Sequence, residues 1–200
     1  RDSSIILLHG SGQSHVVWSL TDQYLADEGF NVFALDLPGH GNSEGSSLKS
    51  IEEMADWLNK VVNVIGIKDL TILGHSQGCL VAIEYANKFP DNIKNLIFVA
   101  GSYQIPVNKS LIDLANAGDF ESINLMMKWG YGYSKQFLGG NPLQKILNSS
   151  REIREVLAID LIACNNYKNG KIAAEKIKCP TLLILGELDK MITLNQGKKF

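Results

Sequence analysis

The chain has 200 residues, a length typical of one ordinary domain, and its 45% hydrophobic and 20% charged residues exclude intrinsic disorder, collagen-like repeats and a coiled coil. Nineteen basic residues against 21 acidic ones give a net charge of −2 with no dense Lys and Arg face, so nucleic acid is not an expected partner. No apolar run approaches the roughly 20 residues that span a bilayer.

Short apolar runs that end at or near glycine recur along the first 100 residues and once more near residue 185. Runs this short, rich in Ile, Leu and Val, predict strands that are buried on both faces of a parallel sheet. The predicted strands are Ser4–Leu8, Asn31–Leu35, Leu70–Leu73, Leu96–Ala100 and Leu182–Leu185.

Stretches with helical periodicity separate the first four strands. Val16–Glu28 places Leu20 and Tyr24 on one apolar stripe, and Ile51–Ile65 and Gln77–Lys88 carry similar stripes. Strands that alternate with helices predict right-handed βαβ crossovers. We therefore predict an α/β fold with a mostly parallel sheet flanked by helices.

The segment from 102 to 178 breaks this rhythm, because no strand is evident in it. Its helical stretches are Ser110–Ala117, Phe120–Trp129 and Glu152–Asn165. Such an insertion is too long for a plain connection. We expect a helical cap (102–178) inserted into a core made of residues 1–101 and 179–200.

The most specific motif is Gly74-His75-Ser76-Gln77-Gly78, which follows a predicted strand and opens a predicted helix. A serine in such a tight turn projects its hydroxyl above the sheet, and the two glycines let neighbouring backbone approach the turn. The alternative is a Gly-Ser turn with no chemistry. We interpret Ser76 as a nucleophile.

A second motif, His9-Gly10-Ser11-Gly12, ends the first strand. An acyl-transfer serine needs two N–H donors aimed at the developing oxyanion. We expect one donor from Gln77 and the other from Ser11, although an ordinary strand-to-helix turn would have the same composition. His9 is expected to organise the loop and not to act as a base.

Two further loops carry acidic residues. Residues 36–43 (D-L-P-G-H-G-N-S) are turn formers, so we expect a structural loop near the site, with little part in catalysis for Asp36 or His40. Residues 186–189 (G-E-L-D) follow the last predicted strand, where a Ser-His pair needs a carboxylate to fix the imidazole. Asp189 is the first candidate and Glu187 the second, with a plain turn as the alternative.

The three cysteines, Cys79, Cys164 and Cys179, are odd in number and widely spaced, without a C-x-x-C pair. This pattern predicts free thiols, as opposed to a disulfide framework or a zinc site, and hence a reducing, cytoplasmic location. The opening residues Arg1-Asp2-Ser3-Ser4 lead straight into an apolar run, so no signal peptide is expected.

The four motifs, taken in their order along the chain, resemble those of the alpha/beta-hydrolase superfamily, specifically its capped serine esterases. The resemblance covers nearly the whole chain, with the cap in its usual place. It implies that Ser76 is the nucleophile, Asp189 the triad acid, and the N–H groups of Ser11 and Gln77 the oxyanion hole. The matching residues are H-G-S-G (9–12), D-L-P-G-H-G-N-S (36–43), G-H-S-Q-G (74–78) and G-E-L-D (186–189).

The chain departs from the family in its histidines. In the family the base follows the acid in sequence, but His9, His15, His40 and His75 all precede Ser76. No carboxylate is placed by the sequence to orient His9 or His40. The chain also begins on what should be the family's third strand, so both ends look cut and the outer strands truncated. We expect a further loop histidine beyond residue 200.

We therefore expect a serine hydrolase that cleaves a carboxylic ester of a small, partly apolar substrate through an acyl-enzyme on Ser76. C–C bond hydrolysis or perhydrolysis would use the same residues. A non-catalytic small-molecule binder is the alternative from another class, and the missing histidine is the only feature that favours it. No metal ion or organic cofactor is expected, and the oligomeric state is not indicated.

The predicted cap concentrates Met and aromatic residues between 119 and 138. Such side chains pack cores but also line adaptable apolar pockets. We expect at least two of them to face a cavity above Ser76. The eight residues are Phe120, Met126, Met127, Trp129, Tyr131, Tyr133, Phe137 and Leu138.

Overall fold

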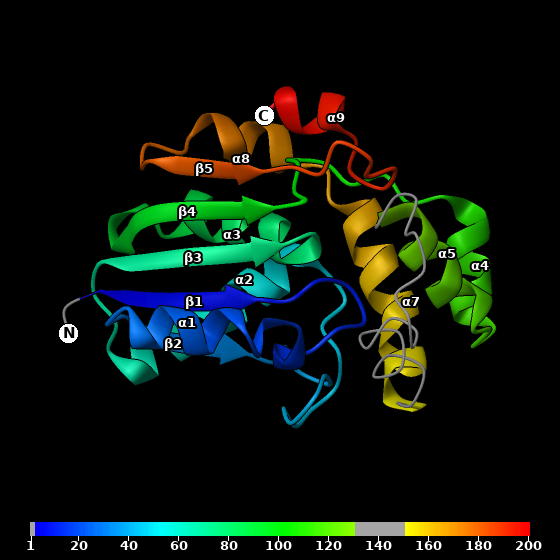
Figure 1. Ribbon diagram of the computed structural model, residues 1–200, viewed down its shortest axis with the longest axis horizontal. Helices are drawn as coiled ribbons and strands as arrows, with labels where there is room; N and C mark the ends of the chain where they lie inside the picture. Colours follow the sequence, from blue (N-terminus) through cyan, green and yellow to red (C-terminus); the bar gives the residue numbers. More distant parts are fainter. Residues whose placement is uncertain (1–2, 131–150) are drawn as a thin grey trace.

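A parallel sheet forms the centre of the computed structural model, which describes residues 3–130 and 151–200, the side chains of 151–155 excepted. Its strands are β1 (Ser4–Leu8), β2 (Asn31–Leu35), β3 (Leu70–His75), β4 (Ile93–Val99) and β5 (Thr181–Ile184). They lie in the order β2-β1-β3-β4-β5, and every neighbouring pair is parallel (Figure 1). The carboxyl ends of all five therefore meet at one edge, and the predicted α/β fold is confirmed.

Helices cover both faces of the sheet, which is why the strands read as continuous apolar runs. Along β1, Ile6 and Leu8 belong to the main apolar core that also contains residues of α2 (Ile51–Ile65) and α3 (Gln77–Lys88). Their neighbours on β1 belong to a separate cluster on the other face, built around Trp18. Successive side chains of β1 thus anchor opposite helical layers.

The first predicted helix is split in two. It consists of the 3₁₀ turn η1 (His15–Trp18) and the helix α1 (Thr21–Asp27). The single apolar stripe predicted there is wrong for Leu20 and Tyr24, whose side chains are 89% and 63% exposed. Because the helix is interrupted between the two pieces, residues before and after the break do not follow one helical periodicity. These two residues are therefore not brought onto the buried face.

The helices after β4 form a layer beyond the carboxyl ends of the strands (Figure 1). This layer contains α4 (Lys109–Asn116), α5 (Glu121–Gly130) and α7 (Arg151–Asn166). The three helices share an apolar cluster of their own, built around Leu111, Ile123, Leu157 and Leu161. The predicted helices at these positions are confirmed to within one residue at each end, and the domain boundaries at 102 and 178 stay a prediction.

Short helices that the sequence analysis did not include complete the chain. They are η2 (Pro90–Asn92), α8 (Gly170–Glu175) and α9 (Leu194–Lys198). Ala173 of α8 belongs to the main core and not to the apolar cluster that α4, α5 and α7 share. No helix in the described ranges is long and apolar enough to cross a membrane.

The turn between β3 and α3 has an unusual backbone. Ser76 has a φ of 51° and a ψ of −113°, a conformation that non-glycine residues rarely adopt. Its N–H donates to the carbonyl oxygen of Val99 on the neighbouring strand at 3.0 Å. Because the surrounding sheet fixes this conformation, the serine is held above the strand ends at the first turn of α3.

The glycines on either side of Ser76 are required by close backbone contacts. A Cβ atom at Gly74 would lie 2.5 Å from the carbonyl carbon of Gly78, and one at Gly78 would collide with the carbonyl oxygen of Leu8. The predicted role of both glycines is confirmed, since each allows backbone to approach the turn where a side chain would not fit.

Gly78→Ala should lower the free energy of unfolding by about 1–3 kcal/mol, the usual cost of overpacking. The loss should appear although alanine favours a helix over glycine by about 1 kcal/mol. Denaturant unfolding measures it, with Gly186→Ala as the matched control, because a Cβ there meets nothing closer than 3.5 Å. Equal stability of the two variants would contradict the packing account.

Candidate active site

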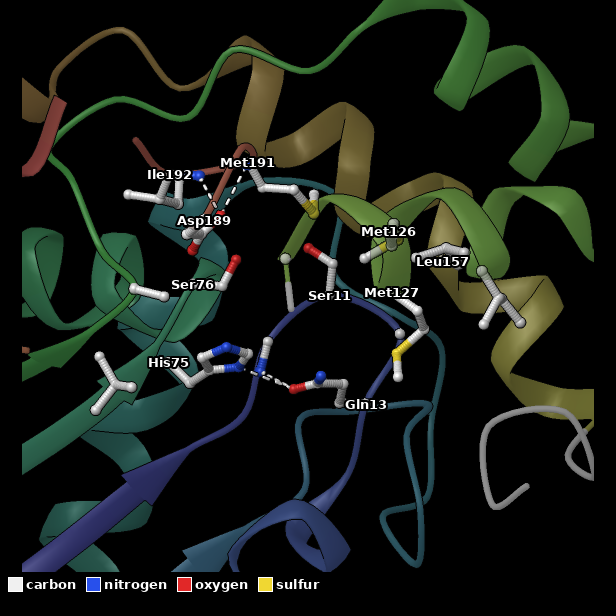
Figure 2. Close-up of a pocket in the computed structure, with 16 residues that line it drawn as sticks. Ser11, Gln13, His75, Ser76, Met126, Met127, Leu157, Asp189, Met191 and Ile192 are labelled. Carbon is white, nitrogen blue, oxygen red and sulfur yellow. Dashed lines mark hydrogen bonds between the residues drawn. The ribbon is translucent and has the colours of Figure 1, made fainter. Parts of the chain in front are cut away.

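A cavity of about 310 Å³ lies over the carboxyl ends of the strands, below the helical layer. It brings together three of the four residues predicted from sequence, because Ser11, Ser76 and Asp189 all line it. Figure 2 shows Ser76 and Asp189 close together, Met126 and Met127 on the opposite side, and Ser11 between them. Gln77 does not line the cavity with its side chain, which is fully buried.

The hydroxyl of Ser76 makes no hydrogen bond with any described residue. Its backbone instead is tied into the sheet through the bond to Val99. A side chain held by its backbone while its oxygen stays unpaired is free to react with a group that enters the cavity. The local sequence produces this arrangement because the flanking glycines permit the strained turn.

The loop after β1 presents one free N–H group between two occupied ones. Gly10 N–H donates to Gln13 Oε1 at 3.0 Å, and Gly12 N–H donates to Asp160 Oδ2 at 2.8 Å. Ser11 N–H, between them, makes no hydrogen bond with a described residue. Gln77 N–H, at the first position of α3, also has no such partner. These two unpaired donors belong to the residues predicted for the oxyanion hole.

Asp189 lies in the loop that follows β5. One of its oxygens, Oδ1, accepts the N–H groups of Met191 at 2.7 Å and Ile192 at 3.0 Å. Burial raises the pKa of Asp189 above its ordinary value, although the bonds from these two N–H groups oppose the shift. The second candidate, Glu187, is exposed and does not line the cavity.

None of the four histidines hydrogen-bonds to Ser76. His75 lines the cavity beside Ser76, but its Nδ1 donates to Gln13 Oε1 at 3.0 Å (Figure 2). Burial lowers the pKa of His75 to about 4, so its ring is neutral near pH 7. His75 is therefore bonded to the loop after β1 and oriented by no carboxylate. The expectation that the base is another histidine stays a prediction.

Two other histidines do have carboxylate partners, and for His40 this corrects the expectation drawn from sequence. His40 Nε2 donates to Asp160 Oδ2, and His15 Nδ1 bonds Asp36 Oδ2, both at 2.8 Å. Neither pair reaches Ser76. The sequence analysis missed Asp160 because it lies 120 residues after His40, and no local spacing relates a cap residue to a loop of the core.

A second cavity of about 270 Å³ meets the first at Ser76. The two cavities also share Ser11, Met126 and Met191. The expectation that at least two Met or aromatic residues of the cap face this region is confirmed by Met126, Met127 and Trp129, which line one or both cavities. Tyr131, Tyr133, Phe137 and Leu138 lie outside the described residues.

The described residues contain no group of three or more His, Cys, Asp or Glu side chains that could hold a metal ion. All three cysteines are unpaired, as predicted. Burial raises the pKa of Cys164 to about 12, so this thiol beside Ser11 is not an alternative nucleophile.

Curated proteins resemble this chain over different spans. A Mycobacterium tuberculosis protein described as uncharacterized is 36% identical over 107 residues, covering 52% of this chain and 31% of that protein. The chain thus spans about a third of that relative's length. The Vibrio cholerae pimeloyl-[acyl-carrier protein] methyl ester esterase is 36% identical over 102 residues, covering 51% of this chain and 38% of the esterase.

One curated relative matches almost the whole chain. The 2-hydroxy-6-oxononadienedioate/2-hydroxy-6-oxononatrienedioate hydrolase of Escherichia coli K12 is 25% identical over 214 aligned positions, covering 98% of this chain and 74% of that enzyme. Among solved structures, the enol-lactonase from Burkholderia xenovorans superimposes with a TM-score of 0.81 at 20% identity, covering 100% of this chain and 78% of that one. That structural likeness concerns the fold.

The family-level match covers most of the chain. Residues 4–138 match the family described as alpha/beta hydrolase fold, and this span includes β1 to β4, the turn at Ser76 and the loop at Ser11. Since the match extends over more than half of the residues of this chain, the chain belongs to the alpha/beta hydrolase fold family.

Proposed function

We propose that this protein is a serine hydrolase that cleaves a carboxylic ester of a small, partly apolar substrate. The observation that carries the proposal is the environment of Ser76. Its hydroxyl, which has no hydrogen-bond partner among the described residues, lines an apolar cavity together with Ser11 and the Asp189 carboxylate, and Ser11 N–H and Gln77 N–H likewise have no partner among those residues. Nucleophile, oxyanion donors and triad acid are the parts that acyl transfer needs in one place.

In the proposed reaction, Ser76 Oγ attacks the ester carbonyl and its proton passes to a base. The negative charge that develops on the carbonyl oxygen is stabilised by the N–H groups of Ser11 and Gln77. The base then protonates the departing alcohol, which leaves an acyl group on Ser76 Oγ. Water attacks this acyl-enzyme by the reverse proton path, releasing the acid and restoring the serine.

Asp189 would orient the base and stabilise its charged form. Its Oδ1 is occupied by two backbone N–H groups, so Oδ2 is the atom that would accept the imidazole N–H. None of the four histidines in this chain hydrogen-bonds to Ser76, and we therefore name no residue as the base.

The lining of the first cavity supports an apolar substrate group. Ile123, Met126, Met127 and Leu157 contribute hydrophobic surface, and no Lys or Arg is among its described lining residues. The named ester substrate of the Vibrio cholerae relative supports ester chemistry. The second cavity is also lined by Ser76 and would hold the other half of the ester.

C–C bond hydrolysis is the second candidate, and the near full-length match to the Escherichia coli hydrolase favours it. That enzyme's named substrates are dianions. The first cavity offers no cation among its described lining residues, and only Lys190 contributes one to the second. This charge distribution favours the neutral ester. A cytoplasmic location, inferred from the unpaired cysteines, also stays a prediction.

Ser76→Ala in the full-length protein should reduce turnover of a p-nitrophenyl ester by about 10⁴–10⁶-fold without loss of fold, because the acyl-enzyme cannot form. A fluorophosphonate probe should label the wild type at Ser76. Ser19→Ala is the control, since its hydroxyl bonds Val16 O on the surface. Turnover by Ser76→Ala within tenfold of the wild type would contradict the assignment, and an unlabelled, folded wild type would indicate a binding protein.

Asp189→Asn and Glu187→Gln form a matched pair for the triad acid. Asp189→Asn should lower kcat by about 10⁴-fold, because an amide cannot stabilise the imidazolium that forms during the reaction. Glu187→Gln should leave kcat within twofold, since Glu187 is exposed outside the cavity. Steady-state kinetics measure both, and the reverse ranking would transfer the role to Glu187.

Substrate charge is tested by two p-nitrophenyl esters of equal acyl length. The butyrate should have a kcat/KM at least about tenfold above that of the hemisuccinate, because the carboxylate of the latter would lose its hydration without gaining a cation. A preference for the hemisuccinate would show that an anion-binding group reaches the cavity, and would favour the C–C hydrolase alternative.

A further inference from the structure

A carboxylate of the cap reaches into the core beside the candidate oxyanion hole. Asp160 of α7 has no exposed surface. Its Oδ2 accepts both Gly12 N–H and His40 Nε2–H, each at 2.8 Å, while Oδ1 has no partner among the described residues. We call Asp160, His40 and Gly12 the cap anchor. It joins α7 to two loops of the core.

His40 supplies the charge that a buried carboxylate needs. Its Nε2 faces Asp160, and its Nδ1 lies 3.1 Å from the carbonyl oxygen of Pro38. Because both partners only accept hydrogen bonds, both ring nitrogens carry a proton. Burial alone would lower the pKa of His40, but the bond to Asp160 and the charge of that group outweigh it and raise the pKa.

His9 lies beside the cap anchor and stays neutral, so it adds no second positive charge next to that of His40. Its ring lies 4.9 Å from that of His40. His9 Nδ1 donates to Gly10 O at 2.8 Å, and Nε2 accepts Leu37 N–H at 3.1 Å. Burial and the charge of His40 lower the pKa of His9 to about 4. The expected role of His9 in organising this loop agrees with these bonds.

The anchor fixes the peptide groups next to the proposed donor Ser11 N–H. Gly10 N–H on one side is held by Gln13, and Gly12 N–H on the other is held by Asp160. Gly12 has a φ of 64°, in the left-handed region that glycine adopts without strain, and in this conformation its N–H meets Asp160. Ser11 N–H shares its peptide group with Gly10 O, which accepts His9 Nδ1–H at 2.8 Å and Gln13 N–H at 3.1 Å, and the bond to Asp160 restrains the peptide group that follows.

We propose that Asp160 is a positioning residue: the cap carboxylate, paired with His40, holds Gly12 so that Ser11 N–H is directed at the oxyanion. This inference rests on the proposed function. Placement of the cap over the cavity would thereby complete the oxyanion hole, and the cap would contribute to the chemical step in addition to substrate binding.

Stability alone does not account for such a pair. Replacing a buried ion pair by apolar residues of similar volume is often neutral or stabilising, whereas removing one partner leaves a buried charge. The test therefore replaces both charges together. Asp160→Leu with His40→Phe removes the Gly12 acceptor, and Asp160→Asn with His40→Phe keeps an oxygen for Gly12 N–H. The two double variants differ mainly in this acceptor.

In the full-length protein, the Leu/Phe variant should remain folded and lose about 10–100-fold in kcat with KM within threefold. The loss is smaller than the roughly 10²–10³-fold cost of deleting an oxyanion donor because Ser11 N–H remains, though less firmly directed. The Asn/Phe variant should recover to within about fivefold of the wild type. Wild-type kcat in a folded Leu/Phe variant, or an equal kcat loss in both, overturns the inference.

Tyr167→Phe serves as the control for cap–core packing. It removes the buried 2.7 Å hydrogen bond that Tyr167 Oη donates to Glu84 Oε2 of α3. Neither residue lines a cavity or belongs to the cap anchor. This variant should be less stable with kcat unchanged. A kcat loss matching that of the Leu/Phe variant would mean that any loosening of the cap slows the reaction, which overturns the specific role of Asp160.

Amide hydrogen exchange tests the anchor without turnover. Gly12 N–H should be protected in the wild type and in the Asn/Phe variant, and should exchange faster in the Leu/Phe variant. Rapid exchange of Gly12 in the wild type overturns the inference. A wild type that protects Gly12 but shows no serine-dependent turnover contradicts the proposed function instead, so the two failures are distinct.

Discussion

The strained turn between β3 and α3 is the constraint on which the site depends. A non-glycine residue at a φ of 51° is held there by the sheet on one side and the start of a helix on the other. The glycines that flank it allow backbone of β1 and α3 to close around the serine. This packing keeps the hydroxyl of Ser76 above the strand ends, next to Gln77 N–H, which has no hydrogen-bond partner among the described residues. The proposed nucleophile and one proposed oxyanion donor thus come from the same turn.

The second donor depends on contacts that are far apart in sequence. Ser11 N–H follows β1, and the N–H groups on either side of it are held by Gln13 of the same loop and by Asp160 of α7. The helices after β4 therefore contribute in two ways. Met126, Met127 and Trp129 of α5 line the cavities, and we infer that Asp160 of α7 restrains the loop whose N–H group would bind the oxyanion. A change that shifts α7 should affect both substrate fit and the chemical step.

Sequence patterns predicted much of what is local in this molecule, although the short helices η2, α8 and α9 were not predicted. The ranges of α2 and α3, the glycine pair around Ser76 and the bounds of β1 and β2 follow from short-range sterics and periodicity, whereas β4 begins at Ile93, before its predicted start at Leu96. Leu20 was misplaced because a helical stripe presumes an unbroken helix, and one turn of 3₁₀ structure shifts the phase. The pairing of Asp160 with His40 could not be predicted, because it depends on how the cap docks, and a single buried acidic residue in an amphipathic helix gives no signal of its partner.

The central claim is that Ser76 attacks an ester whose oxyanion is held by Ser11 and Gln77. A crystal structure of the full-length protein treated with a fluorophosphonate tests it most directly. We expect phosphorus bonded to Ser76 Oγ, with the phosphoryl oxygen within hydrogen-bond distance of both N–H groups. Gly12 N–H should still be hydrogen-bonded to Asp160. An adduct on another residue, or a phosphoryl oxygen turned away from Ser11 and Gln77, would contradict it.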